Sequence, residues 1–174
     1  PLDTDRGTVS NGNLQVVTPS LEGGTRATMA VSSGKWYWEV TPTAGTNTAT
    51  MIGIADINVP VTSATWTTPS FWGYFGFNGN KYNNNSSAAY GSSYTTNNVI
   101  GVALDMDNGT VTFYKNNVSQ GVAYSSGLSG KTISPALDTG SPSQTASFNF
   151  GQQGFTYTPP TGFVALNTYN LPAS

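Results

Sequence analysis

The chain has 174 residues and a net charge of −2, and it contains no Cys and no His. These absences exclude disulfides, thiol nucleophiles, zinc sites built on Cys or His, and catalytic triads that use imidazole. Charged residues make up 8% of the sequence whereas 61 residues are Asn, Ser or Thr, so neither a basic surface for nucleic acid nor an ordinary enzyme is expected.

Strand signals recur along the whole chain, because runs rich in β-branched and aromatic residues alternate with clusters of Gly, Asn, Ser and Pro. Strands are predicted over residues 14–17, 25–31, 35–41, 50–55, 72–77, 99–106, 110–115, 118–123, 133–137, 145–150 and 162–166. No stretch keeps apolar residues at helical spacing without interruption. Turn signals at these intervals predict an all-β, antiparallel β-sandwich. We expect one domain over residues 1–174.

The clearest unit is a three-stranded meander over residues 99–124. Val99 to Met106 is almost continuously apolar, and Asp107-Asn108-Gly109 then supplies a tight hairpin turn. Residues 110–115 return with alternating faces, and Asn116-Asn117 forms a second turn before the third strand. Four side chains of this unit are therefore expected in the core: Val102, Leu104, Val111 and Phe113.

Two long segments are polar and break the strand pattern. Residues 57–70 contain Trp66 within a run of Ser, Thr and Pro, and residues 78–98 contain an Asn-rich stretch beside Tyr82. Long loops inside compact domains usually carry function or are mobile. These two segments are therefore candidates for recognition.

A series of short segments resembles the motifs of the SPRY domain family, in the family's order. They are GKWYWEV (34–40), IGIA (52–55), WGY (72–74), VIGVALD (99–105), NGT (108–110), FYKN (113–116), PA (135–136), FNFG (148–151) and PPTGF (159–163). The resemblance covers about residues 30–167. It implies a bent, lectin-like sandwich of two antiparallel sheets, of the concanavalin A-like jelly-roll kind. It also implies a non-catalytic module that recognises its ligand through loops at one rim.

The Lys-poor composition and the ending TPPTGFVALNTYNLP resemble SPRY modules of bacteriophage tail or virion proteins. This resemblance implies a virion or extracellular location. Pro1 suggests an excised or processed fragment. No apolar run approaches the length that spans a bilayer, so membrane insertion is not expected.

Neither a metal site nor a catalytic pair is expected. Asp105 and Asp107 begin like a calcium loop, but the position that requires Glu is Asn116, so a strand end and a hairpin turn are predicted instead. Glycosidases of lectin-like folds place their two catalytic carboxylates in a short Glu-x-Asp-x-x-Glu or Glu-x-Asp-x-Glu cluster, and no such cluster occurs here. Glu39 lies in the GKWYWEV strand, where the family residue is structural. The chain is therefore expected to need no cofactor or metal and to be no enzyme.

In peptide-binding SPRY domains the recognition surface includes the turn after the WGY strand and the loop after the Pro-Ala strand. By the resemblance these correspond to residues 82–85 and 138–141, and the neighbouring loops 42–49 and 57–70 are expected to join the same rim. The predicted rim therefore consists of loops 42–49, 57–70, 82–89 and 138–144. Its candidate ligand-binding residues are Tyr82 as an anchor, Asn83, Asn84, Asn85, Asp138, Thr139, Ser141 and Trp66. Tyr and Asn together suit neutral recognition. The alternative remains that residues 83–87 are a solvated turn braced by nearby tyrosines.

The leading functional hypothesis is an adhesion module of a phage tail fibre or virion protein that binds a host-surface glycan or protein. Other virion proteins are possible partners. One alternative is a structural decoration or fibre domain that packs against its own particle. Another is a peptide-binding adaptor of the eukaryotic SPRY type.

Overall fold

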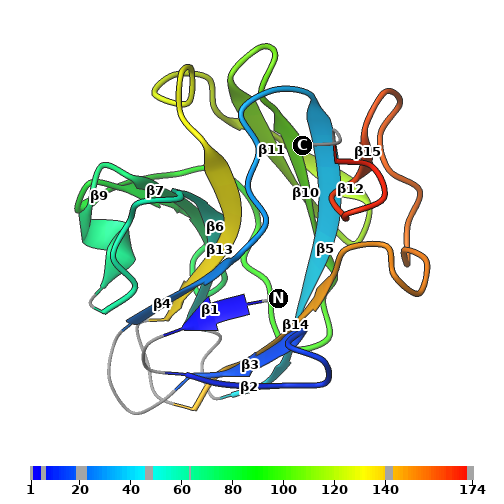
Figure 1. Ribbon diagram of the computed structural model, residues 1–174. Coiled ribbons are helices and arrows are strands. Elements are labelled where there is room, and N and C mark those ends of the chain that lie inside the picture. Colours follow the sequence, from blue (N-terminus) through cyan, green and yellow to red (C-terminus); the bar gives the residue numbers. More distant parts are fainter. Residues whose placement is uncertain are drawn as a thin grey trace.

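The computed structural model describes residues 2–4, 7–18, 23–45, 49–62, 64–139 and 143–171. These residues form a pair of β-sheets that pack face to face, and β13 and β6 of one sheet stand opposite β10 and β5 of the other (Figure 1). In spatial order, the first sheet contains β1 (Leu2–Thr4), β4 (Gly23–Ala27), β13 (Ile133–Thr139), β6 (Thr50–Asp56), β7 (Phe71–Phe75), β8 (Lys81–Asn83) and β9 (Ser86–Ala88). Its pairs are all antiparallel.

The second sheet is also antiparallel along its main path. In spatial order it contains β12 (Val118–Tyr124), β11 (Thr110–Lys115), β10 (Ile100–Asp105), β5 (Lys35–Ala44), β14 (Thr145–Asn149), β3 (Gln15–Val17) and β2 (Thr8–Ser10). β15 (Val164–Ala165) adds a short parallel pair to β5, at Val164–Trp36 and Ala165–Tyr37. The predicted all-β, two-sheet antiparallel sandwich is thus confirmed, with this one parallel pair added.

Each predicted strand overlaps an observed one, but four short strands were not predicted. These are β1, β2, β8 and β9, each three residues long. Residues 78–98 were expected to be a loop, and this was wrong for the β8–β9 hairpin. Its turn residues Asn84 and Asn85 have φ values of 52° and 58°, which fit a two-residue hairpin turn that twists with its strands.

The core between the sheets follows from the alternation of side chains along the strands. On β6, Ile52 and Ile54 point into the main core cluster, whereas Met51 and Ala55 belong to a second cluster on the other face. The expected burial of the central meander is confirmed, because four side chains have 0% exposure: Val102, Leu104, Val111 and Phe113.

Gly53 in the IGIA strand is required by a close approach of backbones. A Cβ atom at this position would lie 2.3 Å from the carbonyl oxygen of Trp72 on the paired strand β7. That contact is too short for any side chain, so the sequence needs Gly here.

Asp105 ends β10 and fixes the following turn, as the sequence predicts. Its Oδ1 accepts the backbone N–H of Asn108 at 3.0 Å, and its Oδ2 accepts the Asn108 side-chain amide at 2.8 Å. Lys35 Nζ lies 3.2 Å from Oδ2. Burial opposes ionisation of Asp105, but the hydrogen bonds from Asn108 and the Lys35 ammonium outweigh it and lower its pKa.

Because the folded pKa of Asp105 lies below the unfolded one, its contribution to stability is present above about pH 4 and is lost as the pH falls through the folded value. As the pH falls below about 4, we expect the free energy of unfolding of Asp105→Asn to decline less steeply than that of the unmodified protein. Urea titrations at stepped pH values measure both slopes. Parallel curves for the two proteins would contradict this origin of the acid sensitivity.

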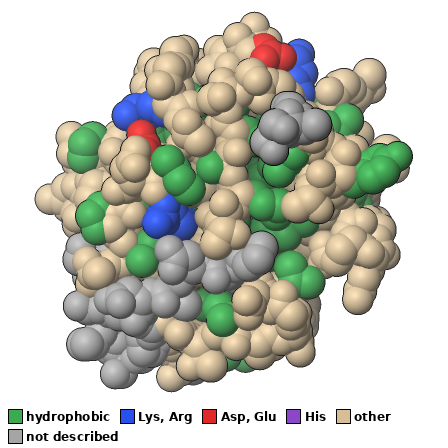
Figure 2. Space-filling model, in the orientation of Figure 1, with side chains coloured by type: hydrophobic (Ala, Val, Ile, Leu, Met, Phe, Trp, Pro, Cys, Tyr) green, Lys and Arg blue, Asp and Glu red, His purple; other side chains and the backbone are tan. Residues whose placement is uncertain are grey.

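The exterior is dominated by uncharged polar groups. In Figure 2 few Lys, Arg, Asp and Glu side chains are visible on the face shown, and they are scattered. Among the described residues no helix is long and apolar enough to cross a membrane.

Candidate functional site

The outer face of the first sheet carries a second apolar cluster, separate from the core. Side chains that point away from the core on β6, β7 and β13 meet residues of the 57–70 loop there. The buried members are Met51, Ala55, Val59, Phe71 and Ala136, and the partly buried members are Trp66, Phe75 and Tyr82. Trp66 belongs to the 3-10 helix η1 (Thr65–Thr67), which contacts β7 and β8 and is seen close to β7 in Figure 1.

Four aromatic side chains form a continuous surface on this cluster, and we call them the aromatic patch: Trp66, Phe75, Phe77 and Tyr82. Tyr82 packs edge-to-face against Trp66 at 5.9 Å and against Phe75 at 5.4 Å, measured between ring centroids. Phe77 lies 6.2 Å from Phe75 and is 63% exposed. Trp66, Phe75 and Tyr82 are therefore half-buried, whereas the ring of Phe77 is exposed to solvent.

The turn of the β8–β9 hairpin is attached to the 57–70 loop. The backbone N–H of Asn84 donates to the carbonyl of Thr68 at 3.0 Å, and that of Asn85 donates to the carbonyl of Trp66 at 3.3 Å. The side-chain amide of Asn83 donates to the carbonyl of Phe71 at 2.7 Å. Asn83 is thus used within the fold, while the side chains of Asn84 and Asn85 are exposed beside the aromatic patch.

Asp138 and Thr139 do not lie at an accessible rim, which corrects the sequence-based expectation. Both are 0% exposed. Asp138 Oδ2 accepts the Thr65 hydroxyl and the backbone N–H of Trp66, the latter at 3.0 Å, and Oδ1 accepts the Thr139 N–H at 2.6 Å. Burial raises the pKa of Asp138, and these hydrogen bonds partly oppose the shift. Asp138 therefore holds η1 and Trp66 in place from beneath. Ser141 lies outside the described residues.

The fold brings some of the expected rim together. Loops 57–70 and 82–89 meet through the hydrogen bonds of Asn84 and Asn85. Gly45 and Gln144 lie against each other, so the described ends of loops 42–49 and 138–144 also meet. Residues 46–48, 63 and 140–142 lie outside the described ranges.

Sequence reasoning missed Phe75 and Phe77 as members of the site. Both fall in the predicted strand 72–77, and no residue of that strand was named as a candidate for binding. The alternation of β7 was the available signal, since Trp72 and Tyr74 pack in the main core whereas Phe71 and Phe75 belong to the outer cluster.

Carboxylates in the described ranges of the chain do not gather into a metal site; no group of three or more His, Cys, Asp or Glu is found there. Glu39 is 1% exposed, and its oxygens accept the backbone N–H groups of Thr156 and Tyr157, both at 2.9 Å. This carboxylate therefore ties the C-terminal loop to β5.

We expect chelation of calcium to leave the melting temperature unchanged, because the described residues offer no cluster of carboxylates that could make folding depend on a cation. Calorimetric melting with and without EDTA provides the measurement. A drop of several degrees in the presence of EDTA would contradict it.

The structure is thus a two-sheet sandwich with an aromatic surface that is carried by η1, β7, β8 and the residues directly after β7. Residues 35–153 match the SPRY domain family, and the chain belongs to this family. SPRY domains are generally non-catalytic modules that bind proteins.

Relatives of known sequence contain this module within much longer proteins. The chain is 32% identical over 146 residues to the ATP-dependent RNA helicase DDX1 of Xenopus laevis, covering 83% of this chain and 19% of that protein. It is 34% identical over 146 residues to Ddx1 of Drosophila melanogaster, covering 81% and 19%. It is 29% identical over 168 residues to the E3 ubiquitin-protein ligase RKP of Arabidopsis thaliana, covering 89% and 13%. The chain therefore spans less than a fifth of these relatives.

Solved structures show the same fold. The SPRY domain of human HERC1 superposes with a TM-score of 0.76 at 22% identity, covering 86% of this chain and 97% of that one. The TRIM65 PSpry domain superposes with a TM-score of 0.67 at 18% identity, covering 83% and 86%.

Proposed function

We propose that this chain binds a segment of a partner protein through the aromatic patch and the adjacent turn at Asn84 and Asn85. The observation that carries the proposal is the exposed Phe77, continuous with the half-buried rings of Phe75, Tyr82 and Trp66. Aromatic side chains of this kind are the anchors that dominate the energies of protein interfaces.

The chemistry of this surface favours a neutral contact. Tyr82 and the exposed Asn84 and Asn85 offer neutral hydroxyl and amide groups beside the rings of the aromatic patch. Binding therefore depends on apolar burial and neutral hydrogen bonds, which salt screens little. We expect the affinity to change little between low and high salt.

The proposal also concerns the kind of protein that contains this module and the place where that protein acts. A phage tail fibre or virion protein in an extracellular location would use the patch to bind a host-surface protein or another virion protein. The peptide-binding adaptor role has the support of SPRY kinship, because SPRY domains generally bind proteins.

A purely structural decoration domain has less support. That role is favoured by exposed apolar side chains gathered on one face. Among the described residues the exposed large hydrophobics are spread over several elements: Val17 on β3, Phe77 after β7, Val118 and Val122 on β12, Val164 on β15, and Tyr169. β3 and β12 lie towards opposite edges of the second sheet.

Selection from a displayed peptide library against the full chain tests the proposal. Enriched peptides are then titrated into ¹⁵N-labelled protein, where the Trp66 indole N–H and the side-chain amides of Asn84 and Asn85 report on the patch. We expect these signals to shift upon binding. The proposal fails if no peptide is enriched, or if the bound peptide perturbs only signals away from the first sheet.

A further inference from the structure

A concave surface lies on the outer face of the second sheet, away from the aromatic patch. The register places Gln15 of β3, Ser147 of β14 and Thr41 of β5 in one cross-strand row, and Asn149 beside Glu39 in the next. Their strand neighbours Val16, Val40, Ala146 and Phe148 are buried in the main core. The alternation of these strands thus presents a row of amides and hydroxyls outward.

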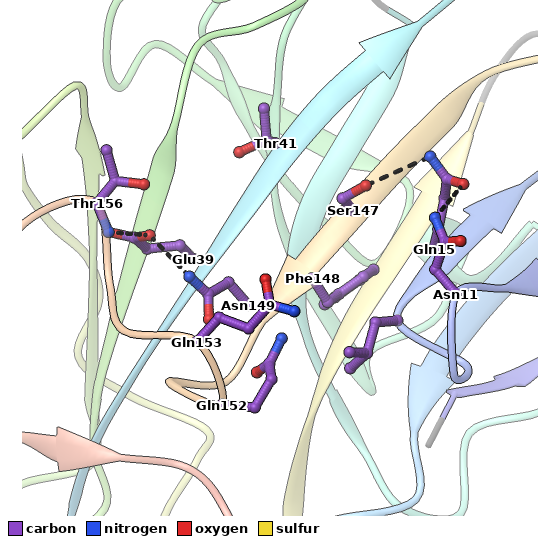
Figure 3. A pocket seen from close by; sticks show the side chains of 11 residues that line it. Asn11, Gln15, Glu39, Thr41, Ser147, Phe148, Asn149, Gln152, Gln153 and Thr156 are labelled. Carbon is purple, nitrogen blue, oxygen red and sulfur yellow. Dashed lines mark hydrogen bonds between the residues drawn. The ribbon is translucent and has the colours of Figure 1, made fainter.

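Two segments flank this row of side chains and form with it a groove that has a volume of about 540 Å³. The turn at residues 11–14 forms one side through Asn11 and Leu14, and the loop after β14 forms the other through Gln152, Gln153 and Thr156. Figure 3 shows the two groups of side chains facing each other across the sheet. The volume lies within the range of sites for small ligands.

The groove offers no free charge. Glu39 is the single charged residue of its lining, and it is 1% exposed. Its carboxylate is occupied by the N–H groups of Thr156 and Tyr157, with further hydrogen bonds from the Tyr37 hydroxyl at 3.4 Å and the Asn149 amide at 3.5 Å. A charged ligand would therefore gain no ionic partner in the groove.

Polar groups of the lining remain open to a ligand. Gln152 uses its Oε1 to accept the Phe150 N–H at 2.7 Å, which leaves its amide N–H₂ group to donate. Among the described residues, the side chain of Gln153 and the hydroxyl of Thr41 have no hydrogen-bond partner, and both residues line the groove. Amides and hydroxyls both donate and accept, as the hydroxyls of a sugar do.

We propose that this amide-lined groove is a binding site for a neutral oligosaccharide. A peptide fits less well, because Phe148 is buried at 2% exposure and the lining offers Leu14 as its one other large apolar side chain. Without an exposed aromatic ring to stack on, affinity rests on hydrogen bonds and is weak. The groove and the aromatic patch share no residue.

Titration of ¹⁵N-labelled protein with neutral tetrasaccharides tests the site directly. The probes are maltotetraose, cellotetraose, laminaritetraose and chitotetraose at up to about 10 mM, a concentration that detects a Kd of about 1 mM. We expect at least one of them to shift the side-chain amide signals of Gln15, Asn149, Gln152 and Gln153. The absence of such shifts with all four, or shifts caused by tetraglycine instead, overturns the proposal.

Matched threonine variants separate binding from folding. Thr41→Val removes a groove hydroxyl from β5, and Thr112→Val removes a half-buried hydroxyl from β11 of the same sheet, outside the groove. We expect Thr41→Val to lower the affinity for the tetrasaccharide about five-fold, which is the effect of one lost hydrogen bond. Thr112→Val is expected to bind the tetrasaccharide with the affinity of the unmodified protein. Equal affinities of the two variants for the tetrasaccharide would contradict the proposal that the groove is the binding site. Peptide binding at the aromatic patch is read on different signals, so the two proposals fail independently.

Discussion

Replacement of Phe113 with alanine is expected to lower the free energy of unfolding by about 3–5 kcal/mol. Phe113 is 0% exposed in the main core and contacts the rings of Tyr74 and Tyr90, with centroid distances of 5.4 and 6.1 Å. Its strand β11 lies between β10 and β12, so the surrounding backbone is held on both sides. The variant therefore loses the transfer free energy of the ring and leaves a cavity that cannot collapse fully.

Urea denaturation of Phe113→Ala measures this loss, and Phe77→Ala is the matched control. Phe77 is 63% exposed, so the same truncation there is expected to cost less than about 1 kcal/mol. A loss below about 1 kcal/mol for Phe113→Ala would show that this side chain does not fill the core between the sheets.

Replacement of Asp138 with alanine is expected to cost about 2–4 kcal/mol of stability. The change leaves the Thr65 hydroxyl and the N–H groups of Trp66 and Thr139 without their acceptor in a site that is 0% exposed. The relief of a buried carboxylate offsets some of this cost. Because Asp138 also holds η1, the variant is expected to loosen Trp66 and weaken partner binding.

Thermal and urea unfolding of Asp138→Ala are to be compared with those of Asp107→Ala. Asp107 is exposed and accepts a single hydrogen bond from the N–H of Gly34 at 2.7 Å, so its loss is expected to cost about 1 kcal/mol or less. Equal destabilisation of the two variants would contradict the role assigned to Asp138.

The strands of the sandwich were predictable because their side chains alternate and their turns carry Asn and Gly. The β8–β9 hairpin was not, since Lys81–Asn83 and Ser86–Ala88 are short and polar. These strands exist because β8 pairs with β7 at Tyr82–Gly73 and Lys81–Tyr74. Pairing of this kind depends on the partner strand and leaves no periodic signal in so short a segment.

The candidate site was only partly predictable. Trp66 and Tyr82 were both named from the sequence, but their contact arises only when the 57–70 loop folds over β7 and β8. Asp138 was expected at the surface because it follows the Pro-Ala strand. Its burial depends on Thr65, which is 73 residues away in sequence, and single-sequence patterns carry no information on such a contact.

The most direct test of the account compares the peptide affinity of Tyr82→Ala with that of Tyr169→Ala. Tyr82 lies at the centre of the aromatic patch, between Trp66 and Phe75, whereas Tyr169 is 94% exposed and follows β15 of the second sheet. For a peptide selected from the library, Tyr82→Ala is expected to raise Kd about 30-fold, corresponding to about 2 kcal/mol.

Tyr169→Ala is expected to leave this Kd unchanged. Melting curves of both variants, with Tyr82→Phe as a version that keeps the ring, show whether the fold is intact. A folded Tyr82→Ala that binds the peptide as tightly as Tyr169→Ala would contradict recognition through the aromatic patch, as would a Tyr82→Phe that binds as weakly as Tyr82→Ala.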